Sequence, residues 1–349
     1  MHFDFCIGNP PYQDDTLGNN ESFAPPVYDK FMHASYTIAD KVELIHPARF
    51  LFNAGATPKL WNKKMLQDEH FKVLHCDVKS SNIFKNVDIT GGIAITYHDN
   101  FKVFGKIGVY SQFPELNSIR IKVTASSFQS FSSIMFSSES FKFTNQLHID
   151  YPSVVNILSK GHKFDLKSNV LDNLYGIVFF DEIPHDGYSY VGVYGLCNGK
   201  RGLRYIRRDY IFNQNNLESY KVFLPNANGS GAIGEVDSTP LIGEPFVCGP
   251  MFGSTQTFLS IGSFQSELEA KSCFKYIKSK FARACLALLK ITQSNSPVKW
   301  KYVPLQDFTS DSDIDWSKSI HEIDLQLYKK YGLDVNEIQF IEQHIKSID

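Results

Sequence analysis

The feature that most constrains this chain is a pair of prolines that follows a short apolar run near the N-terminus. Residues 3–8 (FDFCIG) are mostly apolar and end in glycine, which predicts a buried strand that runs into a turn. Pro10 and Pro11 then remove two backbone N–H donors and fix φ twice. Each proline also pushes the residue before it towards an extended conformation. The sequence therefore predicts a stiff loop, rich in carbonyl groups and poor in donors.

The residues that flank the prolines indicate what this loop could hold. Asn9 supplies an amide oxygen before them, and Tyr12 supplies an aromatic ring after them. The Asn9 oxygen and the Pro10 carbonyl are two hydrogen-bond acceptors on adjacent residues. A planar group with an NH2 could donate to both while its ring stacks on Tyr12. We interpret Asn9, Pro10, Pro11 and Tyr12 as a site for such an amine; the alternative is an ordinary turn.

Alternating strand and helix patterns follow this loop. Such alternation is typical of an α/β fold with a mostly parallel sheet, in which ligands bind at the carboxyl ends of the strands. Asn9–Tyr12 would lie at such an end. A turn at Asp99-Asn100 would join the last two strands. The expected elements are helices at 27–39 and 59–68, strands at 42–45, 71–78, 93–97 and 102–110, and a short closing segment at 114–122.

The remainder of the chain has a different pattern. Residues 124–150 begin with a Ser- and Phe-rich stretch whose aromatic content indicates a packed connector. From about 151 to 310, short strand-like runs (188–194, 205–212 and 220–224) alternate with Gly/Asn loops such as 226–231. We expect one long helix at 267–291 and two tail helices at 314–331 and 335–348, with Gly332 ending the first of these.

The formal net charge of −2 means that any contact with nucleic acid must come from a local cluster of cations. The densest cluster lies between 200 and 208, with Tyr205 inside it and Tyr210 just after it. Phosphate contact and a solvated surface are both open interpretations. The cations of this cluster are Lys200, Arg201, Arg204, Arg207 and Arg208.

Cysteine spacing and hydropathy indicate a cytoplasmic protein. The six cysteines form no Cys-x-x-Cys pair, which favours reduced thiols. No apolar run approaches the ~20 residues that span a bilayer, and no secretion leader is evident. His70, His75 and Cys76 lie close in sequence, but their spacing fits a helix end running into a strand better than a metal site.

Phe3-Asp4, Gly8 and Asn9-Pro10-Pro11-Tyr12 together resemble the catalytic motif of S-adenosylmethionine-dependent amino-methyltransferases, above all the DNA adenine-N6 enzymes. The segments 46–50 (HPARF) and 80–92 are similar to adenine-specific methylases of restriction–modification systems, notably those fused to or allied with type IIG restriction enzymes. The tail segments 303–308 and 328–333 resemble the end of the same proteins.

This resemblance implies roles for the loop and a division of the chain. Asn9 and Pro10 would orient the amine of an adenine flipped out of double-stranded DNA, Tyr12 would stack on the base, and S-adenosylmethionine would supply the methyl group. Glutamine in translation release factors shares this motif, but the long chain after Tyr12 favours DNA. The implied domains are the C-terminal half of a Rossmann-like methyltransferase sheet (1–123), a connector (124–150), an α+β target-recognition domain (151–310) and C-terminal helices (311–349).

The glycine-rich turn and the acidic residue that hold the cofactor usually precede this motif, and only residues 1–8 precede it here. We expect an upstream segment or a partner chain to supply them. A permuted order is the other possibility, for which 245–255 is the nearest match. A catalytically incomplete DNA-binding specificity module is the alternative function. The P-loop-like stretch 195–201 and the nuclease-like triplet 269–271 match their motifs poorly.

Overall fold

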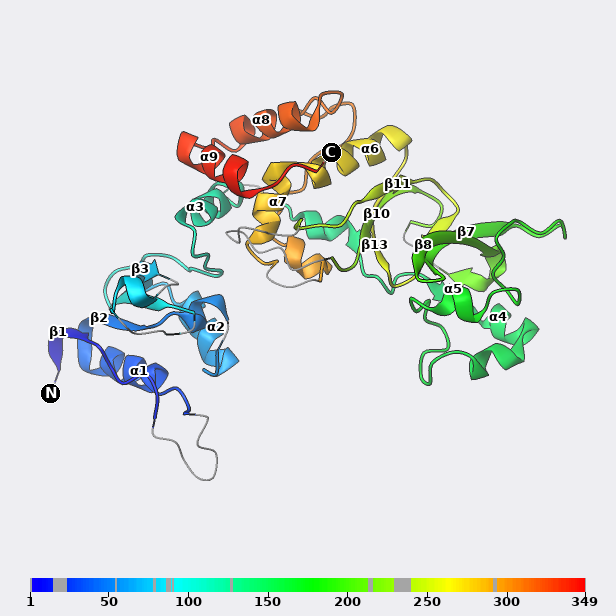
Figure 1. The fold of residues 1–349 in the computed structure, drawn as a ribbon. Coiled ribbons are helices and arrows are strands. Elements are labelled where there is room, and N and C mark those ends of the chain that lie inside the picture. The colour runs from blue at the N-terminus through cyan, green and yellow to red at the C-terminus, as the bar shows by residue number, and fades with distance from the viewer. Residues whose placement is uncertain are drawn as a thin grey trace. The chain divides into compact units, whose positions relative to one another are not determined.

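The structure is a computed structural model that describes residues 2–14, 24–53, 55–77, 80–85, 89, 91–125, 128–212, 216–228, 240–290 and 294–348. Parts of the loops expected at 14–26 and 226–231, and residues 126 and 127 of the Ser/Phe-rich stretch, lie outside this range. The chain divides into two compact units, Met1–Asn117 and Ser118–Asp349. Both helices and strands occur in each unit (Figure 1), so the predicted α/β class is confirmed.

The first unit is built on one four-stranded sheet. Its strands are β1 (Phe3–Gly8), β2 (Ala39–Pro47), β3 (Phe71–Asp77) and β4 (Ile93–Asp99), in the order β1-β2-β4-β3. β1 and β2 are parallel, whereas β4 is antiparallel to both of its neighbours, β2 and β3. β3 therefore runs in the same direction as β1 and β2, and β1 forms one edge of the sheet.

Two helices, α1 (Tyr28–Ile38) and α2 (Lys59–Gln67), contribute to the core on one face of this sheet. Met32 of α1 and Met65 of α2 belong to the same buried cluster as Val42 of β2. Cys6 pairs with Val42 in the parallel register and packs against this cluster. Alternate residues of a strand point to opposite faces, so Phe3, Phe5 and Ile7 share the other face.

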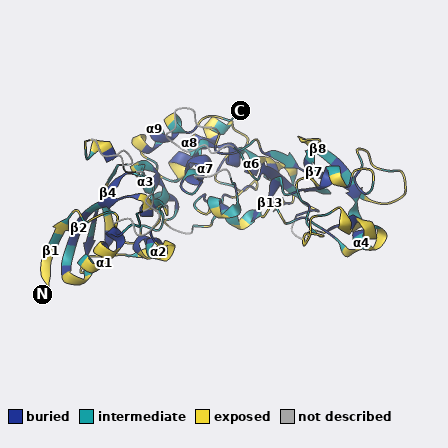
Figure 2. Ribbon diagram, turned by 60° about the horizontal axis from the view of Figure 1, so that its bottom comes forward, coloured by how far each residue is buried: buried dark blue, intermediate teal, exposed yellow. Residues whose placement is uncertain are grey.

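β1 forms where the sequence predicts a strand, but the prediction that it is buried is wrong. Phe3, Phe5 and Ile7 are 45%, 59% and 77% exposed, and Figure 2 shows exposed residues along β1. The apolar composition suggested a central strand, whereas the topology places β1 at the edge, with these three side chains on the face opposite the core. Only Cys6 and Gly8 are half-buried.

The prediction of a strand at 102–110 is also wrong. β4 is already paired on both sides, so a hairpin partner after Asp99 has no free edge to join. The segment instead crosses the end of α2, with the Phe104 N–H donating to the Glu69 carbonyl (2.7 Å). Gly105 and Gly108 have φ of +89° and +67°, which interrupts an extended chain. The segment expected at 114–122 is the helix α3 (Pro114–Val123), which spans the boundary between the two units.

The described residues of the second unit form three small sheets. Their orders are β11-β10-β13-β5, β12-β7-β8 and β6-β9. One buried cluster joins β7 and β8 to the surrounding short helices and loops. The strands are β5 (Met135–Phe136), β6 (Lys142–Phe143), β7 (Tyr190–Cys197), β8 (Lys200–Arg207), β9 (Ile211–Phe212), β10 (Tyr220–Pro225), β11 (Phe246–Cys248), β12 (Phe252–Ser254) and β13 (Phe258–Phe264).

The long helix predicted at 267–291 is two helices, because Ser279 interrupts it. Ser279 is fully buried and has an extended ψ of 146°, and its hydroxyl accepts the Ala282 N–H (3.1 Å). This N-cap starts a new helix after the first has ended. The predicted tail helix at 314–331 starts later, at a Ser319–Glu322 capping box. The helices are α4 (Asn145–Asp150), α5 (Val170–Asn173), α6 (Glu267–Lys278), α7 (Lys280–Ala287), α8 (Ile320–Lys330) and α9 (Val335–His344).

All six cysteines are free thiols. Within the described ranges, no helix combines the length and apolarity needed to cross a bilayer.

His46 predicts a pH dependence of stability. Its ring is fully buried, stacks on Tyr28 and has a pKa that burial lowers from 6.5 to about 4. The unfolded state therefore binds a proton more tightly, so stability is lost as the pH falls from 6.5 towards 4. We expect a loss of about 2 kcal/mol at pH 5 relative to pH 7.5. The measurement is urea unfolding followed by ¹⁹F NMR of 5-fluorotryptophan at Trp61, and an equal pH dependence in His46→Gln would contradict the assignment.

Candidate functional site

The loop Asn9–Tyr12 lies at the carboxyl end of β1, in the first unit. Gly8, the last residue of β1, pairs with Leu44 of the parallel strand β2, so the loop leaves the sheet beside the end of β2. Asn9 and Pro11 are exposed, and Pro10 and Tyr12 are half-buried. The position matches the ligand-binding edge of α/β sheets.

Both ends of this loop are fixed. β1 holds one end, and the segment before α1 holds the other: the Tyr12 carbonyl accepts the Val27 N–H (3.2 Å), and the Asp14 N–H donates to the Pro25 carbonyl (2.9 Å). Val27 is the N-cap residue of α1, so the loop is tied to the start of that helix. With two prolines between these anchors, few backbone torsions remain free.

The Tyr12 phenol faces inward from the loop. Burial raises the pKa of this phenol, and the nearby Asn9 side chain partly offsets the rise. The phenol oxygen is shielded from solvent and has no hydrogen-bond partner of acceptable geometry in the described part of the chain. Because Tyr12 is only half-buried, packing orients the side chain while part of it remains accessible.

An aromatic cluster supports the same edge of the sheet from within. The rings of Tyr28 and His46 are parallel, 5.8 Å apart, and Phe50 and Trp61 lie 4.9 Å apart. Tyr28 directly follows Val27, which binds the loop, so this cluster packs beside the point where the loop is held. Burial raises the pKa of Tyr28 to about 12, which keeps its phenol neutral at physiological pH. Sequence reasoning did not single out Tyr28, because its packing partners lie up to 33 residues away along the chain.

No described segment fits the methionine half of S-adenosylmethionine. A glycine-rich strand–turn–helix would present backbone N–H groups to the carboxylate, but the turn after β1 contains two prolines and lacks those donors. The other candidate, 245–255, forms β11, a turn with Met251 at φ 65°, and β12, and no helix follows. We therefore derive no step from cofactor binding by this chain.

Four of the five cations of the basic cluster lie on β8 of a β-hairpin, and Arg208 lies just after it. β7 and β8 pair in antiparallel register up to Cys197 and Lys200, and Asn198 and Gly199 form the turn with φ of 50° and 75°. Two successive positive φ values are typical of a tight hairpin turn. This geometry rules out a phosphate-binding P-loop at 195–201, which would need a helix after the glycines.

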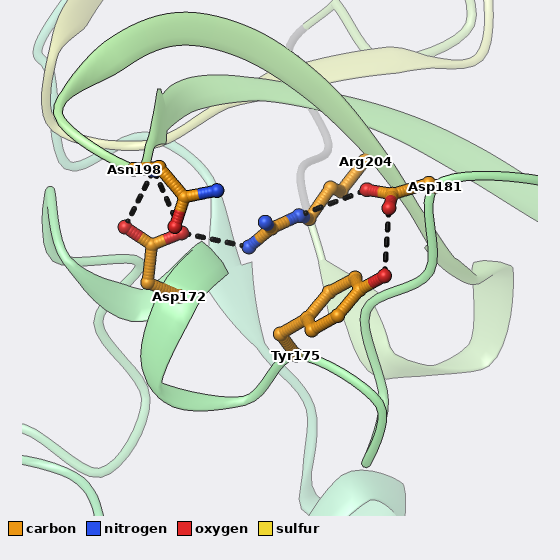
Figure 3. Close-up of a pocket in the computed structure, with 5 residues that line it drawn as sticks. All are labelled: Asp172, Tyr175, Asp181, Asn198 and Arg204. Carbon is orange, nitrogen blue, oxygen red and sulfur yellow. Dashed lines mark hydrogen bonds and ion pairs between the residues drawn. The ribbon is translucent and has the colours of Figure 1, made fainter.

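Arg204 points into the molecule rather than into solvent. Its guanidinium lies between Asp172 and Asp181 and over the ring of Tyr175, at the wall of a pocket of about 190 Å³ (Figure 3). The Arg204 Nη1 donates to Asp172 (2.8 Å) and to the Leu171 carbonyl (2.5 Å), and its Nε donates to Asp181 (3.2 Å). Only 5% of the side chain is exposed.

This arrangement clamps the hairpin turn. Asp172 of α5 accepts the Asn198 N–H with both oxygens (3.1 and 2.9 Å) while it pairs with Arg204. The pocket holds two carboxylates for one guanidinium, so its charge is unfavourable for phosphate. Arg204 therefore serves to position the hairpin.

The other cations of the cluster differ in their partners. Arg207 stacks on Tyr188 and pairs with Asp209 (2.7 Å), and Arg208 pairs with Glu218 (2.9 Å). Lys200 and Arg201 are exposed and have no carboxylate partner in the described part of the chain; the guanidinium of Arg201 lies 5.5 Å from the Phe258 ring centre. Among the five cations, these two at the hairpin tip are free to bind an anion.

The three residues considered for a metal do not form a cluster. The His70 ring contacts the carbonyls of Asp99 and Lys102 instead. The described ranges contain no group of three or more His, Cys, Asp or Glu side chains able to hold an ion.

Comparison with known proteins identifies a similarity in the first unit. Residues 1–84, which include Asn9–Tyr12, match the family model described as Eco57I restriction-modification methylase. Among solved structures, the chain is similar to the type IIG restriction endonuclease BpuSI, with 11% identity and a TM-score of 0.35. The match covers 94% of this chain and 48% of that one, so the chain spans about half the length of its relative. No curated protein matches.

Substitution of the buried Arg204 and of the exposed Lys200 should change stability by different amounts. Arg204→Gln removes the buried cation that donates to Asp172 and Asp181, and we expect a loss of about 2 kcal/mol in the stability of the second unit. Lys200→Gln should change stability by less than about 0.5 kcal/mol. Guanidinium unfolding of both variants measures this, and equal stabilities would contradict the clamp.

Proposed function

We propose that this chain is the acceptor-base and DNA-recognition portion of a site-specific, S-adenosylmethionine-dependent DNA adenine-N6 methyltransferase of a restriction–modification system. The observation that carries the proposal is the loop Asn9–Tyr12, anchored at the carboxyl edge of β1 and at the start of α1. The family match over residues 1–84 supports it, because the matched segment contains both anchors.

The chemistry of the loop suits an exocyclic amine. The lone pair of such a nitrogen is delocalised into the ring, which makes it a poor nucleophile. If both N–H groups donate to fixed acceptors, the Asn9 side-chain oxygen and the Pro10 carbonyl, the nitrogen can move towards tetrahedral geometry and expose its lone pair. Pro11 keeps the acceptors rigid, and the Tyr12 ring stacks on the base, a contact worth about 1–3 kcal/mol.

S-adenosylmethionine would supply the methyl group from its sulfonium. The residues of this chain would bind and orient the acceptor amine, and a strong general base is not needed for that task. Since the described residues do not fit the donor, we assign the donor site to an upstream segment or to a partner chain.

The open edge of β1 supports that assignment. Among the described strands β1 pairs with β2 alone, and Phe3, Phe5 and Ile7 are exposed on the face away from α1 and α2. β1 and β2 pair in parallel, and sheets that contain parallel strands are normally covered on both faces. A further parallel strand and its helix would complete both the hydrogen bonding of β1 and the burial of these side chains.

Double-stranded DNA is the proposed substrate because the second unit offers a hairpin tip suited to phosphate. Lys200 and Arg201 are its exposed cations, and the Arg204 clamp fixes the turn that carries them. The release-factor glutamine is the less suitable acceptor, since it requires no second unit of this size.

The alternative function is a catalytically incomplete DNA-binding specificity module. The observation that favours it is that no described segment of this chain fits the donor. Both functions predict DNA binding that weakens as salt increases.

Titration calorimetry with S-adenosylmethionine tests the donor assignment. We expect no heat of binding with this chain alone, because none of its described turns presents N–H donors for the methionine carboxylate. Clear binding would contradict both the external donor site and the module.

Asn9→Ala tests the acceptor role in the completed enzyme. We expect methyl transfer to fall by at least about 100-fold, because one of the two fixed acceptors is lost, while duplex affinity stays nearly unchanged. The measurements are transfer of labelled methyl to DNA and fluorescence anisotropy, with the exposed Asn156→Ala as the control. Undiminished activity in Asn9→Ala would rule out the amine-orienting role.

A further inference from the structure

Arg49 is an exposed cation at the same sheet edge as the candidate loop. It lies two residues beyond the end of β2, and Asn9 lies one residue beyond the end of the parallel neighbour β1. Its charge lowers the pKa of the nearby Tyr28 phenol, which burial raises, and Tyr28 follows Val27, whose N–H donates to the Tyr12 carbonyl. We propose that Arg49 binds a backbone phosphate of the target DNA strand, beside the base held by Asn9–Tyr12. This inference rests on the proposed function.

Two glycines hold the aliphatic stem of Arg49. A Cβ added at Gly91 would lie 2.4 Å from the Arg49 Cγ, and one added at Gly55 would lie 3.2 Å from the Arg49 Cβ. Both glycines have positive φ, +87° and +82°, so these turns require glycine for their backbone conformation as well. The stem thus lies against two turns that are 36 residues apart in the sequence.

The turn beneath Arg49 is rigid. Arg49–Phe52 form a 3₁₀ helix, and the Ala48 N–H donates to the Gly92 carbonyl (3.0 Å), which joins it to the turn at Gly91. The buried Thr57 hydroxyl donates to Asn62 (2.7 Å), and the Asn62 amide donates to the Asn53 side chain (3.3 Å). This buried network closes the loop between the 3₁₀ helix and α2.

The guanidinium of Arg49 has no carboxylate partner among the described residues. Arg204, Arg207 and Arg208, by contrast, are each paired. The Asp29 carboxylate raises the pKa of Tyr28, but no ion pair joins Asp29 to Arg49. A cation with an immobilised stem and an uncompensated charge is suited to an external anion.

Phosphate is the anion that fits this cation best. A guanidinium binds phosphate through two parallel hydrogen bonds. Because the stem is already ordered, binding costs less side-chain entropy than a free arginine would lose. A nucleotide extruded towards Asn9–Tyr12 brings its two flanking phosphates to the sheet edge. The donor carboxylate is the other anion of the reaction, but the described residues of this chain do not fit the donor.

The test uses the full 349-residue chain and a fluorescein-labelled duplex with one adenine opposite an abasic site, which lowers the cost of extrusion. We expect Arg49→Gln to weaken binding by about fivefold and to reduce the slope of log K against log salt by about 1. Arg49→Lys should lose less, because it keeps the charge. Lys64→Gln, an exposed cation on α2, is the matched control and should bind as the wild type does.

A second arm identifies the phosphate. Neutral methylphosphonates at the two linkages that flank the adenine should weaken the wild type and leave Arg49→Gln unchanged. Equal affinity of Arg49→Gln and wild type, or an equal methylphosphonate penalty in both, would overturn the inference. A wild-type chain without salt-dependent DNA binding would overturn the proposed function itself, so the two failures are distinguishable.

Discussion

The parallel pairing of β1 with β2 is the constraint on which the candidate site depends. It brings the carboxyl ends of two strands to one edge, and both Asn9–Tyr12 and Arg49 leave the sheet there. The Val27 N–H then ties the loop to α1, whose core side packs on the same two strands. Without this pairing, the two prolines would still stiffen the loop, but its direction relative to the sheet would not be determined.

The same pairing places β1 at the edge of the sheet in the first unit. Paired strands satisfy their backbone groups, whereas an edge strand keeps a row of free N–H and C=O groups. β1 combines such an edge with three exposed apolar side chains. Proteins that expose an apolar edge usually cover it in their assembled state, so the free edge of β1 and the proposed donor site are most simply explained together.

Burial divides cations that look equivalent in the sequence. Arg204 is surrounded by carboxylates and a carbonyl, because a buried charge is tolerated only with such partners. Lys200 and Arg201, at the turn of the same hairpin, remain in solvent. Arg49 is intermediate: its stem is packed and its head is free. A cation can contribute to ligand binding only if its charge is not already neutralised, and this depends on its neighbours in space.

The sequence alone determined the α/β class, the position of β1 and the other strands of its sheet, and the stiff carbonyl-rich loop, because these follow from apolar periodicity and from the covalent geometry of proline. It could not determine which strand lies at an edge, so β1 was expected to be buried and 102–110 was expected to pair. It also could not show that Ser279 would cap a second helix, or that Asp172 and Asp181 would neutralise Arg204. Only the tertiary structure decided these points, since edge position, burial and charge pairing depend on contacts between residues far apart in the chain.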